Sequence, residues 1–171
     1  MANARILQAC DAAVALILAG WKASSSPPGD DDAVTRVYAP SISFTLDSPP
    51  PIVGRQVFVF PGPYQATTFT RADQLRDYKI RVLIVEQYSE AEGDPPEAWV
   101  DVRVNFCEQM IFNPLVNPAL NLIDEMFPAL EEQAVVDLLY HDDKLLKDKV
   151  FWSVMTFPFQ EDTLQTGGVS L

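Results

Sequence analysis

Few side chains in this sequence could carry out chemistry. The single histidine, His141, is followed directly by Asp142 and Asp143. A zinc site there would need further ligands, and no cysteine or second histidine is available to supply them. We therefore expect the charged stretch around His141 to be a solvated turn, and the sequence predicts no metal site.

Other residue types that act in catalysis lack the partners they would need. Ser24–Ser26 has no base nearby in sequence, and Gly62 lies in a Pro-Gly-Pro turn rather than in a phosphate-binding loop. No two carboxylates share an apolar setting that would separate their pKa values. The run Asp30–Asp32 lacks the alternating ligand spacing of a calcium loop, so a solvated turn is expected. We predict no catalytic residues, no cofactor and no enzymatic activity.

The two cysteines, Cys10 and Cys107, are expected on apolar helix faces, where a free thiol behaves as a small hydrophobe. A disulfide between them is the alternative, but nothing else indicates an oxidising compartment. The segment Ala12–Ala19 could pass for a signal-peptide core, yet Asp11 stands at its edge and Trp21 occupies the place of a cleavage site. No run is long enough to span a bilayer, so we expect a soluble protein that is not exported.

Composition places the chain among acidic globular proteins. It has 171 residues, of which 48% are hydrophobic, and a formal net charge of −12. Such a chain repels nucleic acid on average, although an acidic wall would let DNA slide past without sticking. We expect a single domain over residues 1–159 with a loop at 24–32 and an excursion at 115–133. Residues 160–171 are expected to form a flexible C-terminal tail.

Two amphipathic helices are predicted from apolar residues spaced three and four apart. The first covers Asn3–Lys22. The second has Asp94 as its N-cap and Pro95 at its first helical position, and Pro114 ends it. The aromatic side chains of the second helix, such as Phe106, are expected in the core.

Period-two alternation with β-branched residues predicts four strands, which are Gln56–Phe60, Tyr78–Glu86, Ala134–Tyr140 and Val150–Phe159. Val34–Phe44 is expected to be an edge strand or an arm, because Pro40 interrupts it. Asn117-Pro118 could open a short helix in the excursion and Phe127-Pro128 could close it. The predicted fold is α+β: a four-stranded, mainly antiparallel sheet with both helices packed on one face.

The connection between the first two strands is too long for a tight turn. It predicts a long hairpin that projects from the sheet and contacts partners. Basic residues gather in or beside this hairpin, whereas acidic residues dominate elsewhere. They either solvate an outer face or form a basic edge that meets an acidic edge of the next copy and closes a ring head to tail. These basic residues are Arg71, Arg76, Lys79 and Arg81.

Several of these runs together resemble the tail terminator (neck) proteins of long-tailed bacteriophages. The runs are RVYAPSISFTL, QVFVFPG and FTRADQLRDYKIRVLIVEQ, followed by a helix and then VFWSVMTF. The family's V-x-V-x-P strand, its loop with a hydroxyl residue and an arginine, and its D-Y-x-I-x-V strand have counterparts here. The matching residues are Val57, Val59, Pro61, Thr70, Arg71, Asp77, Tyr78, Ile80 and Val82.

The resemblance implies a structural virion protein that forms a hexameric ring, caps the tail tube, stops tail polymerisation and joins the tail to the head-completion proteins. Genomic DNA would pass through the lumen without specific binding. The implied location is the tail-neck region of the virion, and the host cytoplasm during assembly, with no membrane partner. The alternatives are a head-completion or connector adaptor of the neck, and a small enzyme or regulator. The residues expected at subunit or partner interfaces are Phe60, Pro61, Tyr64, Phe69, Thr70, Arg71, Arg76 and Tyr78.

Overall fold

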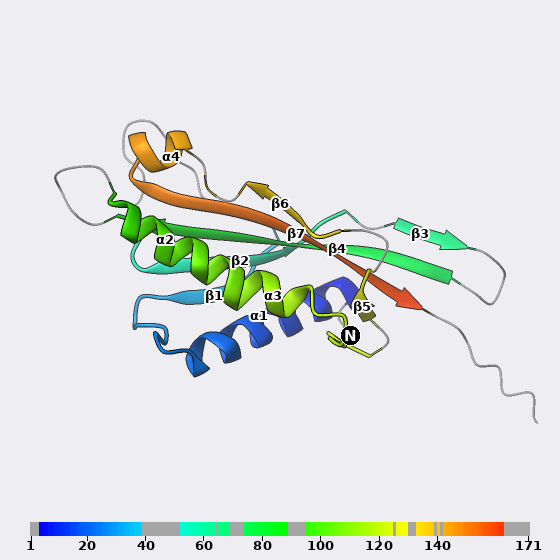
Figure 1. The fold of residues 1–171 in the computed structure, drawn as a ribbon. Coiled ribbons are helices and arrows are strands. Elements are labelled where there is room, and N and C mark those ends of the chain that lie inside the picture. The colour runs from blue at the N-terminus through cyan, green and yellow to red at the C-terminus, as the bar shows by residue number, and fades with distance from the viewer. Residues whose placement is uncertain are drawn as a thin grey trace, which may run out of the picture.

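A mixed seven-stranded sheet forms the centre of the molecule, and two long helical segments cover one of its faces (Figure 1). This computed structural model describes residues 4–38, 52–63, 65–68, 74–88, 95–124, 126–129, 133–138, 140 and 142–162. The α+β class predicted from the sequence is confirmed.

The two longest strands, β4 (Gln74–Gln87) and β7 (Val150–Asp162), run antiparallel along the middle of the sheet. Strands β2 and β3 pair with β4, strand β1 pairs with β2, and strands β5 and β6 share the outer edge of β7. The bounds of these strands are Ala33–Arg36 for β1, Arg55–Pro61 for β2, Gln65–Thr68 for β3, Met126–Pro128 for β5 and Val135–Leu138 for β6.

The predicted count of four strands is wrong. Strand β1, expected as an edge strand or an arm, pairs parallel to β2 and makes the sheet mixed. Strand β3 continues the central hairpin, but its polar sequence QATT carries no apolar alternation that would reveal it. Strand β5 lies in the excursion, where a short helix was considered, and its three residues gain their order from pairing with β7.

Alternate side chains divide the sheet into two faces. On one face lies the main core, which joins the helices to the sheet and includes the four β4 residues predicted to share a face, namely Tyr78, Ile80, Val82 and Ile84. Strand β7 contributes its largest buried side chains to the same core, which are Phe151, Phe157 and Phe159. A smaller cluster around Phe60, Leu83, Val85 and Val150 occupies the opposite face, called the second face below.

Helix α1 (Arg5–Ala23) packs on the sheet through one apolar stripe. Trp21, in the last turn, meets Phe106 of the second helix edge to face, with ring centroids 4.7 Å apart. Among the described helices, α1 is long and apolar enough to cross a membrane by length and composition, which was not expected from the sequence. The buried stripe consists of Ala9, Cys10, Ala13, Ile17 and Trp21.

The second helix begins later and ends later than predicted. Its segments are α2 (Glu97–Phe106), a π-helical stretch η1 (Cys107–Phe112) and α3 (Asn113–Leu115). Pro96 is the N-cap, no side chain caps the helix, and the predicted cap Asp94 lies outside the described residues. Pro114 does not end the helix. Pro114 has no N–H to donate, and in an α-helix its ring would clash with the carbonyl of the residue four positions earlier. The wider π-helical turn of η1, which precedes it, leaves room for this ring.

The loop at 24–32 is tied to the sheet rather than being only a solvated turn. The Asp32 carboxylate accepts the Arg55 N–H at 2.6 Å and the Gly29 N–H at 2.9 Å. Gly54 precedes this contact with a φ of 69°, and a Cβ there would lie 2.4 Å from the Asp31 carbonyl oxygen. A glycine is therefore required where the loop meets strand β2.

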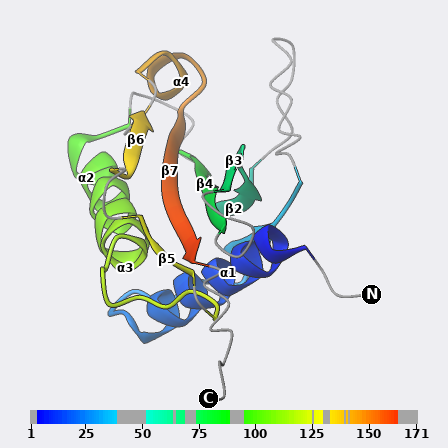
Figure 2. The same cartoon turned by 90° about the vertical axis from the view of Figure 1, so that its right-hand side faces the viewer.

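Two further boundaries differ from the predictions. The charged stretch after His141, expected to be a turn, contains helix α4 (Asp142–Lys147), which buries Leu145. His141 itself lies outside the described residues. Strand β7 continues to Asp162, beyond the expected start of the tail at residue 160. Figure 2 shows α4 and β6 at the end of the molecule away from α1.

Replacing Phe106 with alanine should lower the free energy of unfolding by about 3–5 kcal/mol, because a buried ring against Trp21 leaves a cavity when removed. Chemical denaturation measures this loss. The matched control is Val102→Ala on the same helix, where the side chain is 55% exposed and the expected change is within about 0.5 kcal/mol. Equal losses in the two variants would contradict the assignment of Phe106 to the core.

Candidate functional site

The predicted interface residues fall on different parts of the central hairpin. Phe60 is buried on the second face and Pro61 ends strand β2 beside it, whereas Tyr78 is buried in the main core. Arg76 is described and half-buried. The other four predicted residues, Tyr64, Phe69, Thr70 and Arg71, lie outside the described residues.

The described basic residues of the hairpin, Arg76, Lys79 and Arg81, do not share one face of the sheet. Because side chains alternate along β4, Arg76 shares the helix-covered face with Tyr78, while Lys79 and Arg81 project from the second face. Arg81 places its guanidinium 5.6 Å from the centre of the Phe60 ring. Of the four basic residues predicted to share an edge, Lys79 and Arg81 lie on the second face, Arg76 lies on the other face, and Arg71 is outside the described residues.

Arg76 instead belongs to a cluster around a buried carboxylate near the end of β7. Glu161 is 3% exposed, and its Oε2 accepts a hydrogen bond from the Tyr78 hydroxyl at 2.9 Å. Its Oε1 pairs with Arg5 Nε of α1 at 2.5 Å, and Arg76 Nη1 lies 3.9 Å from Oε2. Arg5 also donates to the carbonyl of Asp124. This cluster ties the start of α1 to the sheet and the excursion.

A second cluster ties the other end of the sheet to α2. Glu86 of β4 pairs with Arg55 at 2.7 Å through one oxygen and with Arg103 through the other. The Arg55 guanidinium also stacks over the Phe106 ring at 4.2 Å, and the Arg103 guanidinium over the Trp99 ring at 4.1 Å. All three charged side chains are less than 15% exposed. The sequence spacing gave no sign of this cluster, since its members come from three elements.

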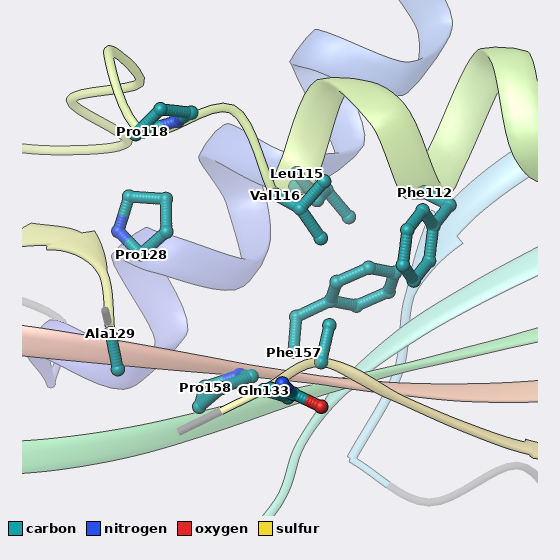
Figure 3. A pocket seen from close by; sticks show the side chains of 10 residues that line it. Phe112, Leu115, Val116, Pro118, Pro128, Ala129, Gln133, Phe157 and Pro158 are labelled. Carbon is teal, nitrogen blue, oxygen red and sulfur yellow. The ribbon is translucent and has the colours of Figure 1, made fainter. Parts of the chain in front are cut away.

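An apolar hollow of about 420 Å³ lies between α3 and the outer edge of β7 (Figure 3). Strands β5 and β6 both pair with this edge, but Phe157 and Pro158 stand between their pairing regions. Phe112 and Phe157 lie together in the hollow, with ring centroids 6.1 Å apart. The lining residues are Phe112, Leu115, Val116, Pro118, Pro128, Ala129, Gln133, Ala134, Phe157 and Pro158.

A second hollow of about 290 Å³ adjoins the first at Phe112 and runs between α2 and β6. It includes Glu108, which is exposed, and Val136, which is 39% exposed. We call the two hollows together the α2–β6 groove. Beside it, Val135 of β6 is 50% exposed, and no other described strand pairs with the outer edge of β6. An apolar edge strand beside an apolar groove is a surface suited to another polypeptide.

The second face carries its own apolar hollow, of about 450 Å³. We call this surface the Tyr38 patch, after a side chain that is 73% exposed. Arg81 brings positive charge into it, and Trp152 and Val154 of β7 contribute half-buried apolar side chains. Its lining residues are Tyr38, Phe60, Pro61, Arg81, Leu83, Trp152 and Val154.

The described residues contain no group of three or more His, Cys, Asp or Glu that could hold a metal ion. Cys10 and Cys107 are free and buried, and burial raises the pKa of each thiol from 9.0 to about 12. A thiol with so high a pKa is almost entirely protonated near neutral pH and is a poor nucleophile.

Comparisons with known proteins do not assign this chain to a family. No protein-family model matches it, and no curated protein matches it either. The surfaces above are interpreted from their own geometry and chemistry.

Replacing Tyr78 with phenylalanine should lower the free energy of unfolding by about 1.5–3 kcal/mol, because it removes a hydrogen bond to a buried carboxylate. Thermal or chemical unfolding measures this loss. The control is Lys147→Ala, which removes an ion pair to Asp143 between side chains that are 74% and 70% exposed, at an expected cost within about 0.5 kcal/mol. A Tyr78→Phe protein as stable as the wild type would show that the Glu161 cluster does not hold the fold.

The raised thiol pKa values predict a pH dependence of stability. Because the folded state holds the thiol protons more tightly, the stabilisation is fully present below pH 9 and is lost as pH rises from 9 towards 12. Denaturant unfolding across this range should show the loss in the wild type. A double variant with alanine at Cys10 and Cys107 should show a shallower decline, and identical pH profiles would refute the prediction.

Proposed function

We propose that this protein is a ring-forming structural subunit of a long-tailed bacteriophage, placed at the end of the tail tube. In this role six copies would close a ring that stops tail polymerisation and presents a surface to the head-completion proteins. The proposal combines the resemblance of the hairpin and strand motifs with the surfaces of the described structure.

The observation that carries the proposal is the α2–β6 groove beside the outer edge of β6, with which no other described strand pairs. The side chains of Val135 and Val136 are 50% and 39% exposed there, although both residues pair with β7 through Thr156 and Met155. A monomeric protein usually covers or charges such an edge, because it pairs readily with another chain. In a ring on a tail tube, a neighbouring copy or a tube subunit would bury this strand edge.

Charge supports the same role. The net charge of −12 makes tight binding to the phosphate backbone unfavourable. A ring that DNA must traverse benefits from walls that do not hold the duplex. An adaptor on the portal side of the neck would share both features, and it differs in the partner it binds.

Electron microscopy of the purified protein mixed with tail tubes tests the proposal. We expect rings at one end of the tubes, a mass near six subunits by light scattering, and no further tube growth after addition of the protein. Binding to portal-side complexes in place of tubes would favour the adaptor. A stable monomer that associates with neither would exclude both roles.

A further inference from the structure

We infer that the α2–β6 groove receives an extended segment of a different protein, and that this segment is apolar and basic. The inference goes beyond the proposed function, because it states the chemistry of a partner whether or not the protein forms rings. It is carried by the lining of the groove, by the outer edge of β6 beside it, and by the charges along α2.

The lining of the groove favours an apolar segment. Of the described residues that line its two hollows, Glu108 is the one that carries a formal charge, and most of the others are apolar. Phe112 lines both hollows and joins them into one surface. Burial of apolar side chains in such a surface drives binding, but it does not fix the conformation or the charge of the bound segment.

The outer edge of β6 favours an extended conformation. Val136 of β6 pairs with Met155 of β7 on one side and lines the groove. No other described strand pairs with the opposite side of β6. A segment added there as a strand would form main-chain hydrogen bonds with β6 and would direct every second side chain towards the groove, as Val136 does.

The charges along α2 favour a basic segment. Glu97, Asp101 and Glu108 are exposed and follow one another at steps of four and seven residues, so they lie in one row along the helix. Val104 belongs to the same row, and it lines the groove together with Glu108. None of the three carboxylates forms an ion pair with another described side chain. Lysine or arginine in the bound segment would compensate this row, whereas acidic segments would be repelled.

A second copy does not supply this positive charge from its described surface. Of the arginines and lysines whose side chains the structure describes, all except Lys22 already have an interaction partner in the same chain. Lys79 and Arg81 on the second face are among those with partners, and half-buried Asp77 shares that face. With a net charge of −12, two copies also repel each other on average. A protein of opposite charge is therefore the occupant that the groove favours.

Selection from a library of random short peptides displayed on yeast tests this inference. Peptides are enriched that bind the wild type more tightly than Val136→Gln, which places a polar side chain in the groove without changing its charge. We expect the enriched peptides to hold more lysine and arginine and fewer acidic residues than the unselected library, with apolar residues at alternate positions. The matched control is Val102→Gln, whose side chain is 55% exposed and lines neither hollow, and it should bind these peptides as the wild type does.

A second variant, Glu108→Lys, tests the charge alone, because it reverses one exposed charge and leaves the apolar lining intact. The most enriched peptide, synthesised and labelled for fluorescence anisotropy, should bind this variant at least about tenfold more weakly than the wild type. Added salt should weaken its binding to the wild type. The matched control is Asp30→Lys, which makes the same change of net charge at an exposed carboxylate of the loop at 24–32 and should leave the affinity unchanged.

The inference is overturned if no peptide distinguishes the wild type from Val136→Gln, if the enriched peptides are neutral or acidic, or if Glu108→Lys binds like Asp30→Lys. It is also overturned if light scattering shows wild-type oligomers that Val136→Gln does not form, because the groove would then hold a second copy. None of these measurements uses tail tubes, so they decide the inference separately from the proposed function.

Discussion

The antiparallel ladder between β4 and β7 is the constraint on which the rest of the molecule depends. It pairs Leu75 with Asp162 at one end and Gln87 with Val150 at the other without a recorded shift in register. Because side chains alternate, this single register decides which residues of both strands meet the helices and which lie on the second face. A slip of one residue between the strands would send either Ile80 of β4 or Phe157 of β7 to the second face and remove that strand's side chains from the core under the helices. Both candidate surfaces would be lost with it.

Buried charge then fixes the ends of this ladder. Glu161, near the end of β7, is held by Arg5 of α1 and Tyr78 of β4, and Glu86 at the other end of β4 is held by Arg55 and Arg103. A buried carboxylate without such donors would be strongly destabilising, so each cluster admits only the arrangement that supplies them. The apolar core brings helices and sheet together, and these two clusters set where each helix lies along the strands.

The spacing of apolar residues in the sequence correctly predicted the long elements, whose pattern repeats over many residues. The helical spacing of apolar residues extends over all of α1, and period-two alternation extends over most of β4 and β7. These patterns were sufficient to predict the α+β class and the shared face of Tyr78 and Ile80. Strands β3 and β5 are short and gain order only from their neighbours, so no local pattern marks them. The Glu161 cluster joins residues as far apart in sequence as Arg5 and Glu161, and the part of the α2–β6 groove beside β6 is lined by α2, η1, α3, β6 and β7. Neither could be found before the topology was known.

The distribution of positive charge explains why surface shape, more than surface charge, must organise contacts of this protein. Five of its described arginines, Arg5, Arg36, Arg55, Arg76 and Arg103, form ion pairs with carboxylates of the same chain. These arginines are thus paired within the chain, which has 12 basic and 24 acidic residues. Long-range forces between copies are then repulsive and weaken with added salt, while burial of apolar surface is not screened. A subunit of this kind binds its neighbours only where apolar surfaces match closely, which favours one defined geometry of assembly over unspecific association.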